Sequence, residues 1–182
     1  MYKPKKTDEE IIHSNPWWIY KHDKFEKEDG TFGDYFYVEM KNNAMIVPVL
    51  DDGRIVLIRQ YRYLQDKESI EFPCGGLEEN EVPSECAKRE LLEEAGYQAG
   101  DLIKVGNFYG LNGLAKDESH LYIGADLKQV SVPQLEETGE IELVFRRVDE
   151  LEQMIIDGKI WDGQTLAAWA LVRDHLYKMI NK

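Results

Sequence analysis

The segment from Gly75 to Tyr97 constrains this chain most, because it specifies one helix with two different faces. Pro83 suits the first helical turn, where its missing N–H is no loss, although Val82 before it offers no capping oxygen. Gly96 supplies a left-handed stop at the other end. An apolar row at i+4 spacing runs between them: Ala87, Leu91 and Ala95. The pattern predicts a helix that packs on one side and carries charge on the other.

The charged side holds three carboxylates, Glu90, Glu93 and Glu94, at positions i, i+3 and i+4. This spacing stacks them about one turn apart, where like charges repel. Such a cluster of hard oxygen ligands favours a divalent cation. The alternative is an ordinary solvated face with weak pairs such as Arg89 with Glu93. The glycine turn at Gly75, with Glu81 and Arg89 in fixed register, favours the metal site.

The full pattern of this segment resembles the Nudix box of the Nudix hydrolases. It runs Gly75, five residues, Glu81, seven residues, Arg89-Glu90, two residues, Glu93-Glu94, one residue and Gly96. Every charged and glycine position of the box is present, and Tyr97 stands where a plain aliphatic residue is usual. The resemblance implies an α/β fold (α+β) with helices on both sides of a mixed sheet, the α/β/α sandwich of the family.

The composition agrees with an enzyme of this kind. The 182 residues suit one catalytic domain, and no apolar run approaches the ~20 residues of a membrane span. The N-terminus is charged without a following apolar region, unlike a secretory signal. Cys74 and Cys86 have neither disulfide nor zinc spacing, so we expect a cytoplasmic protein. The net charge of −13 argues against nucleic-acid or membrane binding.

Periodicity along the chain predicts alternating strands and helices without repeats. We expect an N-terminal β extension over residues 1–40, with strands around a turn at Asp29-Gly30, and a catalytic domain over residues 41–182. A turn at residues 51–53 suggests a hairpin of strands 44–50 and 54–63. Further strands are expected at 102–109, 120–125 and 141–147, and two final helices at 148–157 and 165–180.

Segments outside the box resemble the ADP-ribose pyrophosphatase subfamily. Glu71 to Gly76 is similar to its E-x-P-A-G entry, with Cys74 in the alanine position, and Arg59 to Arg62 is similar to its R-Q-Y-R strand. Residues 113–118 resemble its P-G-(x)₃-E loop, although Asn112 replaces the proline. Gly139 to Glu142 resembles the acidic loop after the box, and Asp162 to Thr165 the D-x-x-T start of a helix.

The resemblance implies hydrolysis of a pyrophosphate in ADP-ribose or a related nucleoside diphosphate sugar, with Mg²⁺ (or Mn²⁺) as cofactor. It implies Glu90 and Glu94 as the main metal ligands, Glu93 sharing a second ion, and the Cys74 carbonyl completing the site. Arg89 would orient the carboxylates, and Glu81 would brace the loop. The implied general base comes from a loop beyond the box: Glu140 is the first candidate and Glu137 the second.

Substrate contacts are expected from several other residues. Arginines can meet phosphate, although strand arginines are equally often exposed ladder charges, and tryptophans can stack on a base, although paired ones are more often buried. The candidate substrate-binding residues are Trp17, Trp18, Arg59, Arg62, Gly76 and Glu118. Related enzymes place the N-terminal sheet across a dimer, so a homodimer is expected.

Two rival functions stay open at this stage. The first is a Nudix hydrolase for another substrate, such as GDP-mannose, a dinucleoside polyphosphate or a damaged nucleotide. The second is a non-catalytic Nudix module that senses nucleotide sugars. The complete set of Glu90, Glu93 and Glu94 favours an enzyme over the sensor, because binding alone needs no such cluster.

Overall fold

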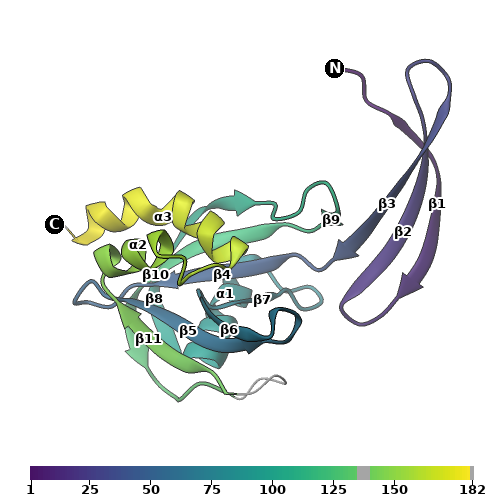
Figure 1. The fold of residues 1–182 in the computed structure, drawn as a ribbon. Helices are drawn as coiled ribbons and strands as arrows, with labels where there is room; N and C mark the ends of the chain where they lie inside the picture. Colours follow the sequence, from purple (N-terminus) through teal and green to yellow (C-terminus); the bar gives the residue numbers. More distant parts are fainter. Residues whose placement is uncertain (135–139, 181–182) are drawn as a thin grey trace. The chain divides into compact units, whose positions relative to one another are not determined.

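The computed structural model describes residues 1–134 and 140–180, and it forms two compact units. One unit combines Met1–Asn42 with Tyr109–Glu118, and the other combines Asn43–Phe108 with Ser119–Lys182. Figure 1 shows the elements of both. The expected division into an N-terminal β extension (1–40) and a catalytic domain (41–182) stays a prediction.

The first unit is a four-stranded sheet in the order β1-β2-β3-β9. Its strands are β1 (Lys5–Ser14), β2 (Trp18–Glu26), β3 (Phe32–Met40) and β9 (Ala115–Lys116). The first three pair antiparallel, and β9 pairs parallel to β3. The predicted strands on either side of Asp29-Gly30 are confirmed, and Gly30 turns the chain with φ +79°. Strand β1 was not predicted, because its charged residues give no alternation and all ten are exposed.

His22 on β2 is a titratable residue with two acidic neighbours, and its pKa can be measured by NMR. Its Nε2 lies 2.7 Å from Asp34 Oδ1 and its Nδ1 lies 3.5 Å from a Glu10 oxygen. The hydrogen bond to Asp34 raises the pKa of His22 above its usual 6.5. The stabilising pair is therefore complete below about pH 6.5 and is lost as the pH rises through the folded-state pKa. We expect Asp34→Asn to lower the pKa of His22 in an NMR titration; an unchanged pKa would contradict the pairing.

The described residues of the second unit form two sheets and three α-helices. One sheet has the order β7-β4-β10-β8 and the other β11-β5-β6. Its elements are β4 (Asn43–Pro48), β5 (Ile55–Arg62), the 3₁₀ turn η1 (Tyr63–Gln65), β6 (Lys67–Glu71), β7 (Cys74–Gly76), α1 (Pro83–Ala95), β8 (Tyr97–Phe108), β10 (Ser119–Gln129), β11 (Glu142–Arg146), α2 (Val148–Ile156) and α3 (Gly163–Ile180).

The predicted hairpin of strands 44–50 and 54–63 is wrong in its pairing. The turn exists, with Gly53 at φ +81°, but only the single bridge Val49↔Ile55 joins the two strands. Strand β4 belongs to the sheet β7-β4-β10-β8, and β5 belongs to the sheet β11-β5-β6. Both are apolar enough to be buried on two faces, and a turn signal alone does not specify which neighbour a buried strand chooses.

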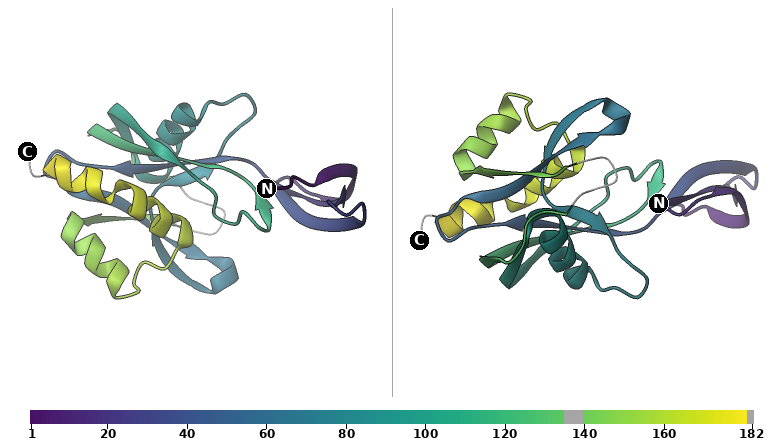
Figure 2. Two further views of the ribbon diagram at one scale, coloured as in Figure 1. Left: turned by 90° about the horizontal axis from the view of Figure 1, so that it is seen from above. Right: turned by 90° about the horizontal axis from the view of Figure 1, so that it is seen from below.

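The helices cover these sheets from two sides, as Figure 2 shows for the larger unit. On β4, Met45 and Val47 pack with residues of α2 and α3, while Ala44 and Ile46 face Ala87, Leu91 and Ala95 of α1. Successive side chains of β4 therefore point alternately into two hydrophobic cores, as expected for a strand that is buried on both faces. The predicted α/β fold with helices in two outer layers is confirmed.

No helix within residues 1–134 and 140–180 is long and apolar enough to cross a membrane.

Candidate active site

The site is built where strand β7 lies against the start of β4 and helix α1. Cys74 and Gly75 pair with Met45 and Ala44 of β4. The predicted helix is confirmed: it begins at Pro83, its N-cap residue Val82 makes no side-chain cap, and Gly96 ends it with φ +73°. The apolar row of α1 is fully buried, and the acidic side faces β7, where Glu94 accepts from the Cys74 amide and Glu90 lies against Gly75.

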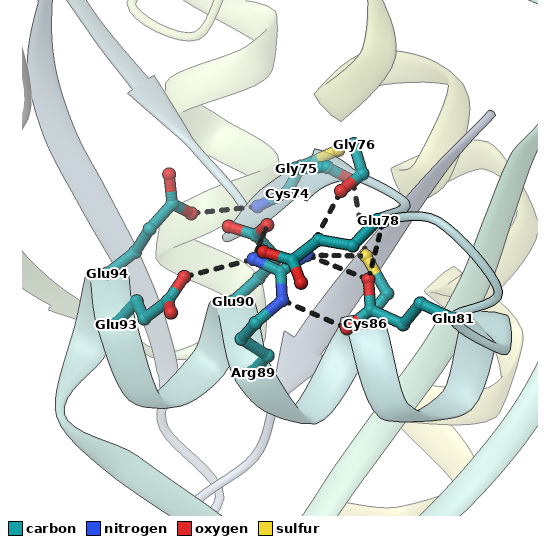
Figure 3. A network of polar contacts seen from close by, with 10 residues as sticks. All are labelled: Cys74, Gly75, Gly76, Glu78, Glu81, Cys86, Arg89, Glu90, Glu93 and Glu94. Atoms are coloured by element: carbon teal, nitrogen blue, oxygen red, sulfur yellow. Dashed lines mark hydrogen bonds and ion pairs between the residues drawn. The ribbon is translucent and has the colours of Figure 1, made fainter. Parts of the chain in front are cut away.

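Arg89 is the centre of the polar network drawn in Figure 3. Its Nε and Nη2 donate to the two carboxylate oxygens of Glu81 at 2.9 and 3.0 Å. Its Nη1 donates to Glu90 at 2.6 Å and to Glu93 at 3.0 Å. Nη2 also donates to the Gly76 carbonyl at 3.0 Å. One guanidinium therefore joins the glycine turn to the carboxylates of the helix, and these hydrogen bonds raise the pKa of Arg89.

Glu81 holds the loop that precedes the helix. Its carboxylate accepts a hydrogen bond from the Glu78 amide at 2.9 Å as well as the pair from Arg89. The bond from Arg89 is the main cause that lowers the pKa of Glu81 to about 2. Glu81 is therefore ionised at any pH where the protein would work, and it acts in this geometry as a brace.

Glu90 and Glu94 are nearly buried carboxylates, with 7% and 5% of their surfaces exposed. A Glu94 oxygen accepts a hydrogen bond from the Cys74 amide at 2.8 Å, so this side chain is fixed against β7. Glu90 lies against Gly75 so closely that an added Cβ there would come within 1.9 Å of its Oε1. Buried charges of one sign this close together are costly without a cation beside them.

Gly75→Ala should therefore impair the site more than the fold. The new methyl group would displace the end of the Glu90 side chain, which can rotate away at little cost in stability. A shift of about 1 Å in a reacting group costs about 10²-fold in rate, so we expect a kcat loss of that order with a small change in Tm. Gly106→Ala on β8 is the matched control, because its Cβ would meet nothing within 4 Å. Equal kcat for both variants would contradict this arrangement.

The donor chemistry of the site fits a divalent cation of the magnesium class. Three carboxylates on one helix face, two of them nearly buried, offer hard oxygen ligands beside the backbone of Cys74. Within the described parts of the chain, no three His, Cys, Asp or Glu side chains form a ready-made cluster around one point. Glu90 and Glu93 turn toward Arg89 and Glu94 turns toward the Cys74 amide. A bound cation would therefore compete with Arg89 for the carboxylates of Glu90 and Glu93.

The two thiols at the site are not suited to act as metal ligands. Burial raises the pKa of Cys74, and the charges of Glu94 and Glu90 raise it further. Burial likewise raises the pKa of Cys86 to about 12. The Cys74 thiol lies 3.6 Å from the Asn43 side-chain oxygen and 3.7 Å from that of Gln164. A protonated thiol leaves only the backbone of Cys74 for the role that the sequence predicts.

The two candidate phosphate-binding arginines on β5 are both engaged by carboxylates. Arg59 donates from Nε to Glu142 on β11 at 3.1 Å and lies 3.8 Å from Glu68. Arg62 donates from Nε to Glu71 at 2.8 Å and from Nη2 to the second Glu71 oxygen. The proposed phosphate contacts stay predictions, because each arginine already has a partner.

The structure brings only some of the predicted residues together. Glu90, Glu93, Glu94, Arg89, Cys74 and Gly76 form one network on the larger unit. Trp17, Trp18 and Glu118 belong to the smaller unit. There Trp17 is 66% exposed and Trp18 packs 5.3 Å from the His13 ring. Glu140 is exposed, and Glu137 lies outside the described residues.

Two features near the site were not recognised as functional from the sequence. Glu71 is buried beside Arg62, and its only sequence signal is its place in the E-x-P-x-G segment. Thr165 is also buried: its hydroxyl oxygen accepts from the Phe72 amide at 3.4 Å, and its amide donates to Asp162 at 2.7 Å. The start of α3 therefore fixes the chain just before Cys74. The D-x-x-T spacing indicated a helix start, but it carried no information about this contact.

Several known proteins are similar to this chain in sequence. The chain is 30% identical over 147 residues to a methanol dehydrogenase activator of Bacillus methanolicus, covering 80% of each. It is 29% identical to an ADP-ribose pyrophosphatase of Bacillus subtilis (68% of this chain, 67% of that protein). It is 32% identical to a GDP-mannose pyrophosphatase of Salmonella typhimurium, with 62% of each covered.

A solved structure described as an ADP compounds hydrolase has the same fold. Its TM-score is 0.85 at 23% identity, and the match covers 98% of this chain and 97% of that one. The NUDIX domain family model matches residues 40–169, which include β4, β7, α1 and the whole Arg89 network. The chain therefore belongs to the NUDIX family.

Proposed function

We propose that this protein hydrolyses the pyrophosphate bond of ADP-ribose or a related nucleoside diphosphate sugar. The products would be a nucleoside monophosphate and a sugar phosphate. The observation that carries the proposal is the set of Glu90, Glu93 and Glu94 held around Arg89 beside β7. The names of the relatives support the substrate class, since ADP-ribose and GDP-mannose are both nucleoside diphosphate sugars.

Magnesium is the proposed cofactor, with manganese as a substitute. Glu90 and Glu94, with Glu93 and the Cys74 carbonyl, are the residues that would hold it. When bound, it would neutralise charge on the diphosphate and polarise a phosphoryl oxygen. The formal charge of −13 repels an anionic substrate, and bound cations would offset this repulsion at the site.

The residues of the chain would orient the reactants and move one proton. Water attacks phosphorus: a new P–O bond forms, the bridging P–O bond breaks, and the leaving phosphate carries away the electron pair. Arg89 keeps Glu90 and Glu93 in place through Nη1 while Glu81 fixes its other edge. A loop carboxylate takes the proton of the attacking water, and Glu140 is the first candidate for it.

Glu140→Gln should therefore lower kcat by about 10²- to 10⁴-fold, the usual contribution of a general base. Substrate affinity should change little, because Glu140 is proposed to act on water and not on the sugar. The comparison is Glu137→Gln, measured at saturating substrate under the same conditions. Full kcat in Glu140→Gln with a loss of several orders of magnitude in Glu137→Gln would assign the base to Glu137.

Trp17, Trp18 and Glu118 of the smaller unit are proposed as substrate contacts across the homodimer that the family resemblance implies. Trp17 and Trp18 offer aromatic surface for a nucleobase, and Glu118 offers an acceptor for a ribose hydroxyl. We also propose that the protein is a homodimer of the cytoplasm.

The proposal is tested with a panel of nucleoside diphosphate sugars in magnesium buffer, assayed for the released nucleoside monophosphate. We expect turnover of at least one member, with ADP-ribose first. The rival function is a sensor that binds these compounds without cleaving them. No turnover of any member, with Glu94→Gln binding the ligands as well as wild type, would establish the sensor.

A further inference from the structure

Glu71 is a buried carboxylate next to the site that no step of the proposed reaction uses. It ends strand β6, three residues before Cys74, and only 4% of its surface is exposed. Withdrawing a carboxylate from water to this degree costs several kcal/mol unless a cation pairs with it. Because burying the Glu71 carboxylate costs free energy, we expect this residue to have a role near the site.

The partner of Glu71 is Arg62, which reaches it from the end of β5. Nε donates to one carboxylate oxygen at 2.8 Å and Nη2 donates to the other. This two-bond arrangement fixes the plane of the guanidinium and leaves Nη1 outside the pair. The arginine side chain is 44% exposed although the carboxylate is buried. The buried Glu71 therefore holds the partly exposed guanidinium of Arg62 in one orientation.

Arg62 also lies in the electrostatic field of the candidate metal site. Its pKa is raised first by the hydrogen bond to Glu71 and further by the charges of Asp162 and Glu94. Glu94 is one of the two main candidate metal ligands, and Asp162 caps the helix start that fixes Phe72. The contacts agree with this: Arg62 donates to Glu71, which lies three residues before Cys74, and the Cys74 amide donates to Glu94 at 2.8 Å. The pair therefore lies on the backbone that leads into the proposed site.

We propose that Glu71 is a positioning residue, which fixes the guanidinium of Arg62 for contact with the diphosphate; this rests on the proposed function. A free arginine side chain loses much of its rotational freedom when it binds phosphate. Glu71 imposes that loss during folding, so the arginine is already ordered when substrate arrives. Because the pair is neutral overall, its contribution is orientation and not net charge.

The test compares wild type, Glu71→Gln, Arg62→Gln and the double variant. The first measurement is kcat and KM with the nucleoside diphosphate sugar that wild type cleaves fastest. The second is the Kd of inorganic pyrophosphate by calorimetry in magnesium buffer. Glu152→Gln is the matched control, because it removes the carboxylate of another arginine pair, with Arg173 at 2.7 Å on α2 and α3.

We expect Glu71→Gln to raise KM and the pyrophosphate Kd roughly threefold to tenfold, the effect of freeing one long side chain, with a smaller change in kcat. The same substitution in the Arg62→Gln background should change neither value, because Glu71 acts through Arg62. Glu152→Gln should match wild type. An equal effect in both backgrounds, or no effect in wild type, would overturn the proposal.

The Tm of each variant is measured in the same series, so that a loss of stability is not mistaken for a loss of binding. Arg62→Gln leaves Glu71 buried without its cation, so it should lower Tm more than the double variant does. If Arg62→Gln does not fold, Arg62→Lys takes its place as the background, because one ammonium cannot reproduce the fork. If wild type cleaves no nucleotide sugar, the proposed function fails. The pyrophosphate Kd then still decides whether Glu71 positions Arg62.

Discussion

Glu94→Gln should lower kcat by about 10³-fold or more while the protein stays folded. Glu94 is a proposed ligand of the catalytic ion; loss of such a ligand would remove several kcal/mol of transition-state stabilisation, and each 1.4 kcal/mol is a factor of ten. The glutamine oxygen can still accept the hydrogen bond that the Cys74 amide gives Glu94 at 2.8 Å, so Tm should change little. The measurement is kcat at saturating substrate and magnesium, with Tm by calorimetry.

The control for that substitution lies on the same helix. Glu85 is an exposed residue of the first turn of α1 that pairs with Lys88 at 3.0 Å. Glu85→Gln should retain the wild-type kcat. If Glu94→Gln also retained it, α1 would not hold the catalytic ion.

Arg89→Ala should be the most destabilising substitution at the site. It leaves Glu81, Glu90 and Glu93 without the cation that they share. Breaking a buried or half-buried pair in this way typically costs about 3–5 kcal/mol. We expect a loss of that size in the free energy of unfolding, measured by urea denaturation without divalent cations. Millimolar magnesium should restore part of it, because an ion bound only to the folded state stabilises that state.

The dependence of the free energy of unfolding on pH below 4.5 gives a second test of Arg89→Ala. The folded-state pKa of Glu81 is about 2, so its contribution is present above the unfolded value of 4.5 and is lost as the pH falls toward 2. Arg89→Ala removes the main cause of the lowered pKa, so its stability should fall less steeply between pH 4.5 and 2. An equal slope in both proteins would show that Arg89 does not hold Glu81 ionised.

The part of the site that the sequence predicts is the part built from one continuous segment. Proline, glycine and an apolar row at i+4 spacing determine where α1 begins, ends and packs. Once that row is buried, the carboxylates can point only to the other side. Local chemistry of this kind is visible in the order of residues. The role of Arg89 in orienting the carboxylates is implied by the family resemblance instead, and it stays a prediction.

The features that the sequence did not predict depend on contacts between distant segments. The turn at residues 51–53 is local, but the choice of different sheets by β4 and β5 is not. The sequence leaves Arg59 and Arg62 open between phosphate contacts and exposed ladder charges, whereas in the structure Glu142 and Glu71 reach them across neighbouring strands. Strand β1 forms by pairing with β2, although its own residues are charged and exposed. Arg62 and Glu71 each lie in a motif, but neither motif indicates that the two residues pair, and the other pairings leave no period in the chain.

The most direct measurement is the hydrolysis of ADP-ribose in ¹⁸O-labelled water, with the products identified by mass spectrometry. We predict AMP and ribose 5-phosphate in equal amounts, with one ¹⁸O in one of the two phosphates and no turnover without a divalent cation. Turnover that persists in chelator, or products that arise from a bond outside the diphosphate, would contradict a metal-dependent pyrophosphatase built on α1.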